Sequence, residues 1–77
     1  MMISPEEFYE RRLKGKTLVQ INGEIRKLKH EILRLSRIVN RPDYRSTMDP
    51  AEDVQLICCQ EYLSRAIQAR NEISAFF

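Results

Sequence analysis

The residues best suited to chemistry form a row of cations in the middle of the sequence. They recur at spacings of three and four, and the set is Arg26, Lys27, His30, Arg34, Arg37 and Arg41. On a helix these side chains share an arc of about 100° and form a row about 20 Å long. We call this row the basic ridge. It suits the binding of nucleic-acid phosphates or of an acidic protein groove. The alternative interpretation is a solvated face that binds nothing.

Other reactive residues do not combine into a catalytic or metal site. The segment Gly15-Lys16-Thr17 is similar to the end of a phosphate-binding P-loop, but the glycine required five residues earlier is Glu10. The adjacent Cys58 and Cys59 point about 100° apart on a helix, so they cannot share a metal. We expect them to be reduced core cysteines, with Cys59 closer to the helix seam. We therefore expect no enzyme activity, no catalytic residue, no metal and no cofactor.

A tyrosine follows the basic ridge. Tyr44 stands beside Pro42 and Asp43 and between Arg41 and Arg45. Tyrosine with arginine at a loop tip is typical of an interface hot spot, whereas a tyrosine that folds back would close the end of the core. Both interpretations stay open. The residues expected at a partner interface are Tyr44, Arg45, Cys58, Tyr62, Ala69, Phe76 and Phe77.

The elements that position these residues begin with two capped helices. Ser4, Pro5 and Glu7 are typical of a helix start, and Gly15 ends a helix expected over about 5–14. Thr17 and Gln20 form a second capping box, which predicts a helix over about 17–40. The alternative is a start after Gly23. The apolar stripe of the helix over about 17–40 keeps heptad spacing throughout, also across Gly23. It contains Leu18, Ile21, Ile25, Leu28, Ile32, Leu35 and Val39.

A third helix is expected over about 50–75, after a loop over 41–49. Asp49 is the expected N-cap, Pro50 the first helical residue and Glu52 the N3 residue. Its apolar arc spans about 180°, so this helix should contact two neighbours rather than one. Cys58, Tyr62, Ala69, Phe76 and Phe77 lie on this arc.

Length and charge limit the class of protein. The 77 residues form at most one domain, 1–77, too small for a large enzyme cleft. The net charge of +2 hides a split, because residues 1–45 carry +5 and residues 46–77 carry −3. No apolar stretch is long enough for a membrane span and the N-terminus does not resemble a signal peptide. We expect a cytoplasmic protein without membrane contact.

These elements predict an all-α fold in which a short N-terminal helix packs against one end of a long antiparallel helical hairpin. The wide apolar arc of the third helix would leave apolar surface in water if the chain stayed alone. We therefore expect a homodimer that completes a helical bundle from two hairpins.

The capping segments also support a resemblance. The segment Pro5-Glu6-Glu7-Phe8, the segment 13–17, the heptad helix and the segment 50–54 together resemble small uncharacterised helical-hairpin proteins of bacteria and their mobile elements. The resemblance implies a small cytoplasmic protein that works by contact. It also implies a possible phage or mobile-element inhibitor that binds a host nucleic-acid enzyme such as a CRISPR effector.

Three functions follow as hypotheses. The first is a non-enzymatic, self-associating helical module for protein–protein interaction. The second is nucleic-acid binding through the basic ridge. The third is inhibition of a host protein partner, as the resemblance implies.

Overall fold

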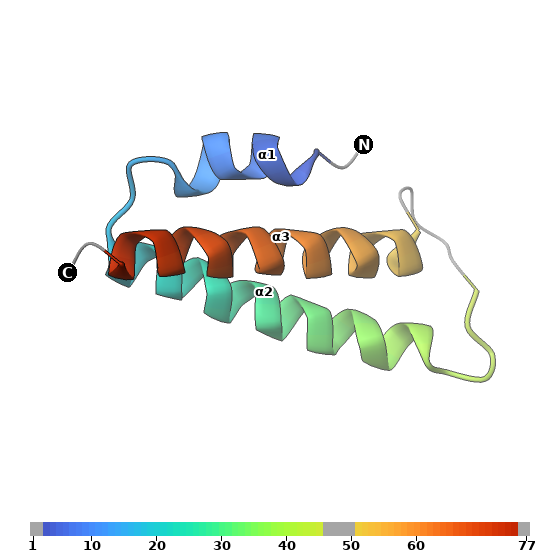
Figure 1. The fold of residues 1–77 in the computed structure, drawn as a ribbon. Coiled ribbons are helices and arrows are strands. Elements are labelled where there is room, and N and C mark those ends of the chain that lie inside the picture. The colour runs from blue at the N-terminus through green and yellow to red at the C-terminus, as the bar shows by residue number, and fades with distance from the viewer. Residues whose placement is uncertain (1–2, 46–50, 76–77) are drawn as a thin grey trace.

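The chain is all-helical in the part that the structure, a computed structural model, describes, which is residues 3–45 and 51–75. The elements are α1 (Pro5–Phe8), the π-helix η1 (Tyr9–Leu13), α2 (Leu18–Val39) and α3 (Glu52–Ser74). In Figure 1, α3 is the middle layer, with α1 on one side and α2, running in the opposite direction, on the other. The expected all-α class is therefore confirmed for these residues.

The N-terminal segment is not the single α-helix expected over 5–14. Ser4 caps α1, because its Oγ accepts the N–H of Glu7 at 3.1 Å. After Phe8 the backbone changes to π-helical hydrogen bonds, and the N–H of Lys14 donates to the carbonyl of Tyr9 at 2.8 Å. Residues five apart lie about 140° from each other on an α-helix. The wider turn brings Phe8 and Leu13 to the same buried side.

The turn into α2 uses the predicted capping residues. Gly15 has a φ of 75°, the left-handed conformation that favours glycine at a helix C-terminus. The N–H of Gln20 donates to Thr17 Oγ1 at 3.2 Å, and the N–H of Thr17 donates to Gln20 Oε1 at 2.9 Å. The helix then continues through Gly23. The capping box at Thr17 therefore marks the start of α2, and a start after Gly23 is wrong.

The core lies on the two buried faces of α3. Toward α2 it meets part of the heptad stripe, of which Ile21, Ile25, Leu28 and Leu35 are buried. Toward α1 and η1 it meets Phe8 and Leu13. The expectation that this helix contacts two neighbours is confirmed, and the second neighbour is the N-terminal segment of the same chain.

The start of α3 differs from the prediction. The helix begins at Glu52 and its N-cap is Ala51, whose side chain makes no capping hydrogen bond. The expected cap Asp49 and first residue Pro50 lie outside the described residues. The hydroxyl oxygen of Tyr44, in the preceding connection, accepts the N–H of Asp53 at 3.3 Å. A side chain nine residues earlier in the sequence thus accepts one of the first N–H groups of α3.

Candidate functional site

All six residues of the basic ridge are exposed on α2 or directly after it. The opposite side of α2 is fixed against α3 by the buried heptad residues, so the helix cannot turn the ridge inward without exposing its seam. Lys29, which we had not included, is also exposed beside the ridge. The arrangement gives one outer layer of the molecule a continuous positive surface.

Two cations of the ridge are paired with carboxylates of the same helix. Lys27 Nζ lies 3.7 Å from Glu24 Oε1, and Arg34 forms hydrogen bonds and an ion pair with Glu31. The Arg34 hydrogen bond lowers the pKa of Glu31 against the opposing effect of partial burial. Within residues 3–45 and 51–75, the remaining members of the ridge have no ion pair, and they are Arg26, His30, Arg37 and Arg41. These four are available to an external anion.

A shallow open hollow follows the second half of the ridge. It measures about 530 Å³ and is lined by His30, Leu33, Arg34, Arg37, Ile38 and Arg41. Leu33 is 51 % exposed and adds an apolar side chain beside the row of cations. The sequence contained a signal for it, because Leu33 is a leucine of this helix outside the heptad stripe.

Tyr44 folds back onto α3. Its side chain is half-buried, and its hydroxyl donates to Glu52 Oε2 at 3.1 Å while accepting the N–H of Asp53. Glu52, the first residue of α3, is almost completely buried. Of the two interpretations of Tyr44, the geometry corresponds to closure of the core end. Arg45 beside it is exposed.

Two residues expected at a partner interface belong to the core of the chain instead. Tyr62 is 5 % exposed and Ala69 is 3 % exposed. We had placed them on an unused face of the third helix, but α1 and η1 cover that face. Cys58 is half-buried against the core cluster. The predicted interface residues Phe76 and Phe77 lie outside the described residues.

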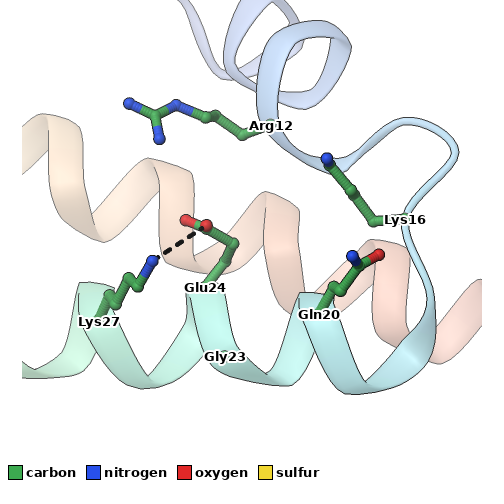
Figure 2. Close-up of a pocket in the computed structure, with 6 residues that line it drawn as sticks. All are labelled: Arg12, Lys16, Gln20, Gly23, Glu24 and Lys27. Carbon is green, nitrogen blue, oxygen red and sulfur yellow. Dashed lines mark ion pairs between the residues drawn. The ribbon is translucent and has the colours of Figure 1, made fainter.

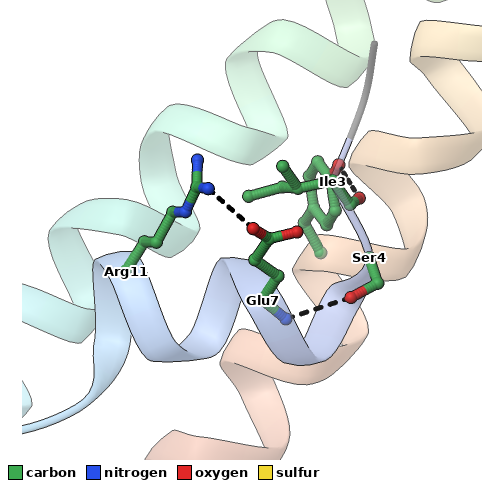
Figure 3. A network of polar contacts seen from close by, with 5 residues as sticks. Ile3, Ser4, Glu7 and Arg11 are labelled. Atoms are coloured by element: carbon green, nitrogen blue, oxygen red, sulfur yellow. Dashed lines mark hydrogen bonds and ion pairs between the residues drawn. The ribbon is translucent and has the colours of Figure 1, made fainter.

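The contacts that hold the N-terminal segment on α3 gather around Tyr62. Its ring stacks on Phe8 with centroids 4.6 Å apart, and its hydroxyl donates to the carbonyl of Ile3. Figure 3 shows that this carbonyl lies next to the Ser4 cap and the ion pair between Glu7 and Arg11. Burial is the main cause that raises the pKa of the Tyr62 phenol. The segment that begins at Ile3 is therefore attached to α3 through both its backbone and its side chains.

Arg65 adds a second attachment one helical turn further along α3. Its guanidinium carbon lies 4.0 Å from the centre of the Tyr9 ring, and its Nε lies 3.2 Å from Glu6 Oε1. The side chain is only 12 % exposed, and Nε and Nη1 have no hydrogen-bond partner in the described part of the chain. We therefore attribute the contact to the ring and to the charge of Glu6 rather than to a directed hydrogen bond.

The two cysteines are free and differ in burial. Cys59 is buried and Cys58 is half-buried, as the seam predicted. Burial is the largest cause that raises the pKa of the Cys59 thiol. Among the residues described, no group of three His, Cys, Asp or Glu side chains could hold a metal ion. None of the described helices has the length and apolar character needed to cross a membrane.

Comparisons with protein-family models, with curated proteins and with solved structures find no match to this chain.

Proposed function

We propose that this protein is a non-enzymatic nucleic-acid-binding protein that contacts the phosphate backbone of a duplex through the basic ridge of α2. One observation carries the proposal: Arg26, His30, Arg37 and Arg41 are exposed on one side of α2 without an ion pair in the described residues. A solvated face could equally hold carboxylates between its cations. Here the only two carboxylates of α2, Glu24 and Glu31, lie beside the ridge and pair with Lys27 and Arg34, which leaves the other four residues without an ion pair in the described part of the chain.

The shape and the composition of the ridge both favour a duplex. An α-helix fits the major groove, and a row about 20 Å long can follow several consecutive phosphates. Three of the four unpaired residues are arginines, which bind phosphate oxygens with two parallel hydrogen bonds. Few aromatic residues lie near the ridge, so the stacking surface typical of single-strand binders is missing from it.

The test is binding of a labelled duplex at increasing salt, followed by fluorescence anisotropy. We expect log K to fall linearly with log salt concentration. The double variant Arg37→Gln, Arg41→Gln should reduce affinity about ten-fold at low salt and reduce the salt slope by about 2.

The matched control is Arg11→Gln, Lys14→Gln. It removes the same charge, but these two cations are paired with Glu7 and Glu10 in the N-terminal segment. We expect its affinity to fall less than two-fold, about 0.4 kcal/mol or less. Equal losses in both variants would mean that net charge rather than the ridge attracts the duplex. Binding that does not depend on salt, or no binding at low salt, would contradict the proposal.

A second candidate function is self-association, the first of the three hypotheses that the sequence supports. Its supporting observation is that Leu33 on α2 and Ile57 on α3 are 51 % and 58 % exposed. In sedimentation experiments this candidate predicts a dimer at micromolar concentrations that Ile57→Glu dissociates. The control is Val19→Glu, because Val19 is 80 % exposed at the other end of the molecule. A monomer of the unchanged chain would contradict self-association and leave nucleic-acid binding intact.

A further inference from the structure

A second hollow lies where the N-terminal segment meets α2. It measures about 290 Å³ and is lined by Arg12, Lys16, Gln20, Gly23, Glu24 and Lys27. Figure 2 shows Arg12 and Lys16 on one side of this space and the residues of α2 on the other. The hollow therefore exists only because the fold brings η1, the link after it and α2 together, and the sequence pattern did not identify it as a site.

The cations of this hollow differ from their neighbours in the same segment. Arg11 pairs with Glu7 and Lys14 pairs with Glu10 through contacts within the helix. Arg12 and Lys16 have no ion pair within the described residues. The N-terminal segment thus pairs the two cations that do not line the hollow and leaves Arg12 and Lys16, which line it, without an ion pair in the described residues.

On the α2 side, one cation is held by one carboxylate. Lys27 Nζ lies 3.7 Å from Glu24 Oε1, a distance at which the ammonium group keeps most of its donors for another acceptor. Gln20 Oε1 accepts the Thr17 N–H in the capping box, which leaves the Gln20 amide NH₂ group as a donor. Arg12, Lys16 and Lys27 with Glu24 give the hollow a net charge of positive two.

Gly23 supplies the space. It lines the hollow within α2, and a Cβ built on it meets no atom within 4 Å. Glycine inside a helix costs roughly 0.5–1 kcal/mol relative to alanine. No neighbouring atom requires a glycine at this position. The effect of the missing side chain is to leave the hollow open between Gln20 and Lys27.

We propose that this hollow binds a phosphate monoester dianion. Such a group carries about two negative charges at pH 7 and three acceptor oxygens, which match the net charge of the hollow and the several donors that line it. A phosphodiester within a nucleic-acid strand carries one charge and would leave the hollow positive. Because the hollow shares Lys27 with the basic ridge, the inference rests on the proposed function in one respect: the expected natural source is the 5′-terminal phosphate of a duplex bound along α2.

The first experiment compares two duplexes of identical sequence, one with a 5′-phosphate and one with a 5′-hydroxyl. The unchanged protein should bind the phosphorylated duplex about ten-fold more tightly, the effect of a new set of charge-assisted hydrogen bonds. Gly23→Glu places a carboxylate in the hollow and should abolish this difference. Val19→Glu carries the same charge outside the hollow and should retain the difference.

Two further variants distinguish loss of the phosphate site from loss of the fold. Gly23→Ala tests whether loss of the glycine itself matters, and it should retain the preference because a methyl group leaves most of the space open. Arg12→Gln replaces Gly23→Glu if circular dichroism shows that the latter has lost helix. It should reduce the preference to about three-fold or less, since one of three cations is lost.

The second experiment titrates isotope-labelled protein with inorganic phosphate and follows the backbone amide signals by NMR. Saturable shifts at residues 12–27 together with the 5′-phosphate preference support the inference. If the shifts occur but no duplex binds, the phosphate site is supported, with a free phosphorylated compound as its ligand, and the proposed function is overturned. Equal affinity for both duplexes and no saturable shifts would overturn the phosphate site, while salt-dependent duplex binding would leave the proposed function standing.

Discussion

The two halves of α3 have the same helical backbone but different surroundings. The half from Tyr62 onward lies between α2 and the N-terminal segment, and its buried residues Tyr62, Ala66 and Ala69 belong to the main core cluster. In the first half, Cys59 and Glu52 are buried outside that cluster. In Figure 1, α1 stops short of the N-terminal end of α3.

The two halves are held by different interactions, because this small chain has few large apolar side chains to bury. In the covered half, two small alanines let neighbouring helices approach closely while Phe8 and Tyr62 supply the large apolar area. In the other half, Leu35 is buried on α2, and the hydrogen bonds of Tyr44 attach the connection to the first turn of α3. Local unfolding should therefore start at the end of the molecule where Tyr44 contacts the first turn of α3.

The largest effect should come from removing the cover of the core. Phe8→Ala deletes the ring that stacks on Tyr62, and we expect a loss of about 3 kcal/mol in the free energy of unfolding in urea. Hydrogen exchange should increase most in residues 5–13. The control Val19→Ala, at a position 80 % exposed, should change stability by less than about 0.5 kcal/mol. If Phe8→Ala left exchange in the N-terminal segment unchanged, the three-layer description would be wrong.

The next effect concerns the closure at the other end. Tyr44→Phe removes the hydroxyl that joins Glu52 and the Asp53 N–H, so stability should fall by about 1–2 kcal/mol. Exchange should increase in the first turn of α3 and stay constant at Tyr62. Tyr9→Phe is the control, because the Tyr9 hydroxyl has no hydrogen bond in the part of the chain described. An equal response of both halves to Tyr44→Phe would remove the distinction between them.

A third substitution, Gly23→Ala, should stabilise one end of the molecule and leave the other unchanged. Gly23→Ala should raise the free energy of unfolding by roughly 0.5–1 kcal/mol, because alanine restricts the unfolded chain and nothing in the structure obstructs its methyl group. We expect slower exchange in the N-terminal half of α2 and little change near Leu35. If Gly23→Ala destabilised the protein, the fold would require glycine at this position for a reason other than close contact with a neighbouring atom.

The smallest effect comes from the adjacent cysteines. At pH 8, iodoacetamide should modify Cys58 faster than Cys59, because Cys59 is more buried and its thiol pKa is raised. Above pH about 8.5 the Cys59 thiol ionises in the unfolded chain, whereas the buried thiol of the folded chain stays protonated to a higher pH because its pKa is raised. The free energy of unfolding in urea should therefore change little between pH about 7 and about 8.5 and fall from there to pH about 9.5, and Cys59→Ala should weaken this fall. Equal modification rates would place the two thiols in equivalent environments.

Local signals predicted much of the fold. Ser4, Gly15 and Thr17 act within one turn of their own positions, and the structure uses each as its chemistry predicts. The heptad stripe correctly identified the buried face of α2, since apolar residues at that spacing have no other common side. The exposed basic ridge follows from the same periodicity.

The misplaced residues depend on contacts between distant segments. Tyr62 and Ala69 looked available because a helical wheel shows that a face is apolar but not which segment covers it. The cap supplied by Tyr44 crosses from the connection to α3, so no local pattern near Ala51 reveals it. The π-turn arises because Phe8 and Leu13 must both reach the core, a requirement set by α3.

The sequence by itself determined the helical class, the two N-terminal capping sites, the seam of α2 and the row of cations opposite it, because each depends on spacing along one helix. Only the tertiary structure decided which part of the apolar arc of α3 the N-terminal segment covers. It also decided that Arg12 and Lys16 meet Lys27 around one hollow. The physical reason is that helical periodicity fixes the direction of a side chain relative to its own axis, whereas its neighbours depend on how separate helices pack.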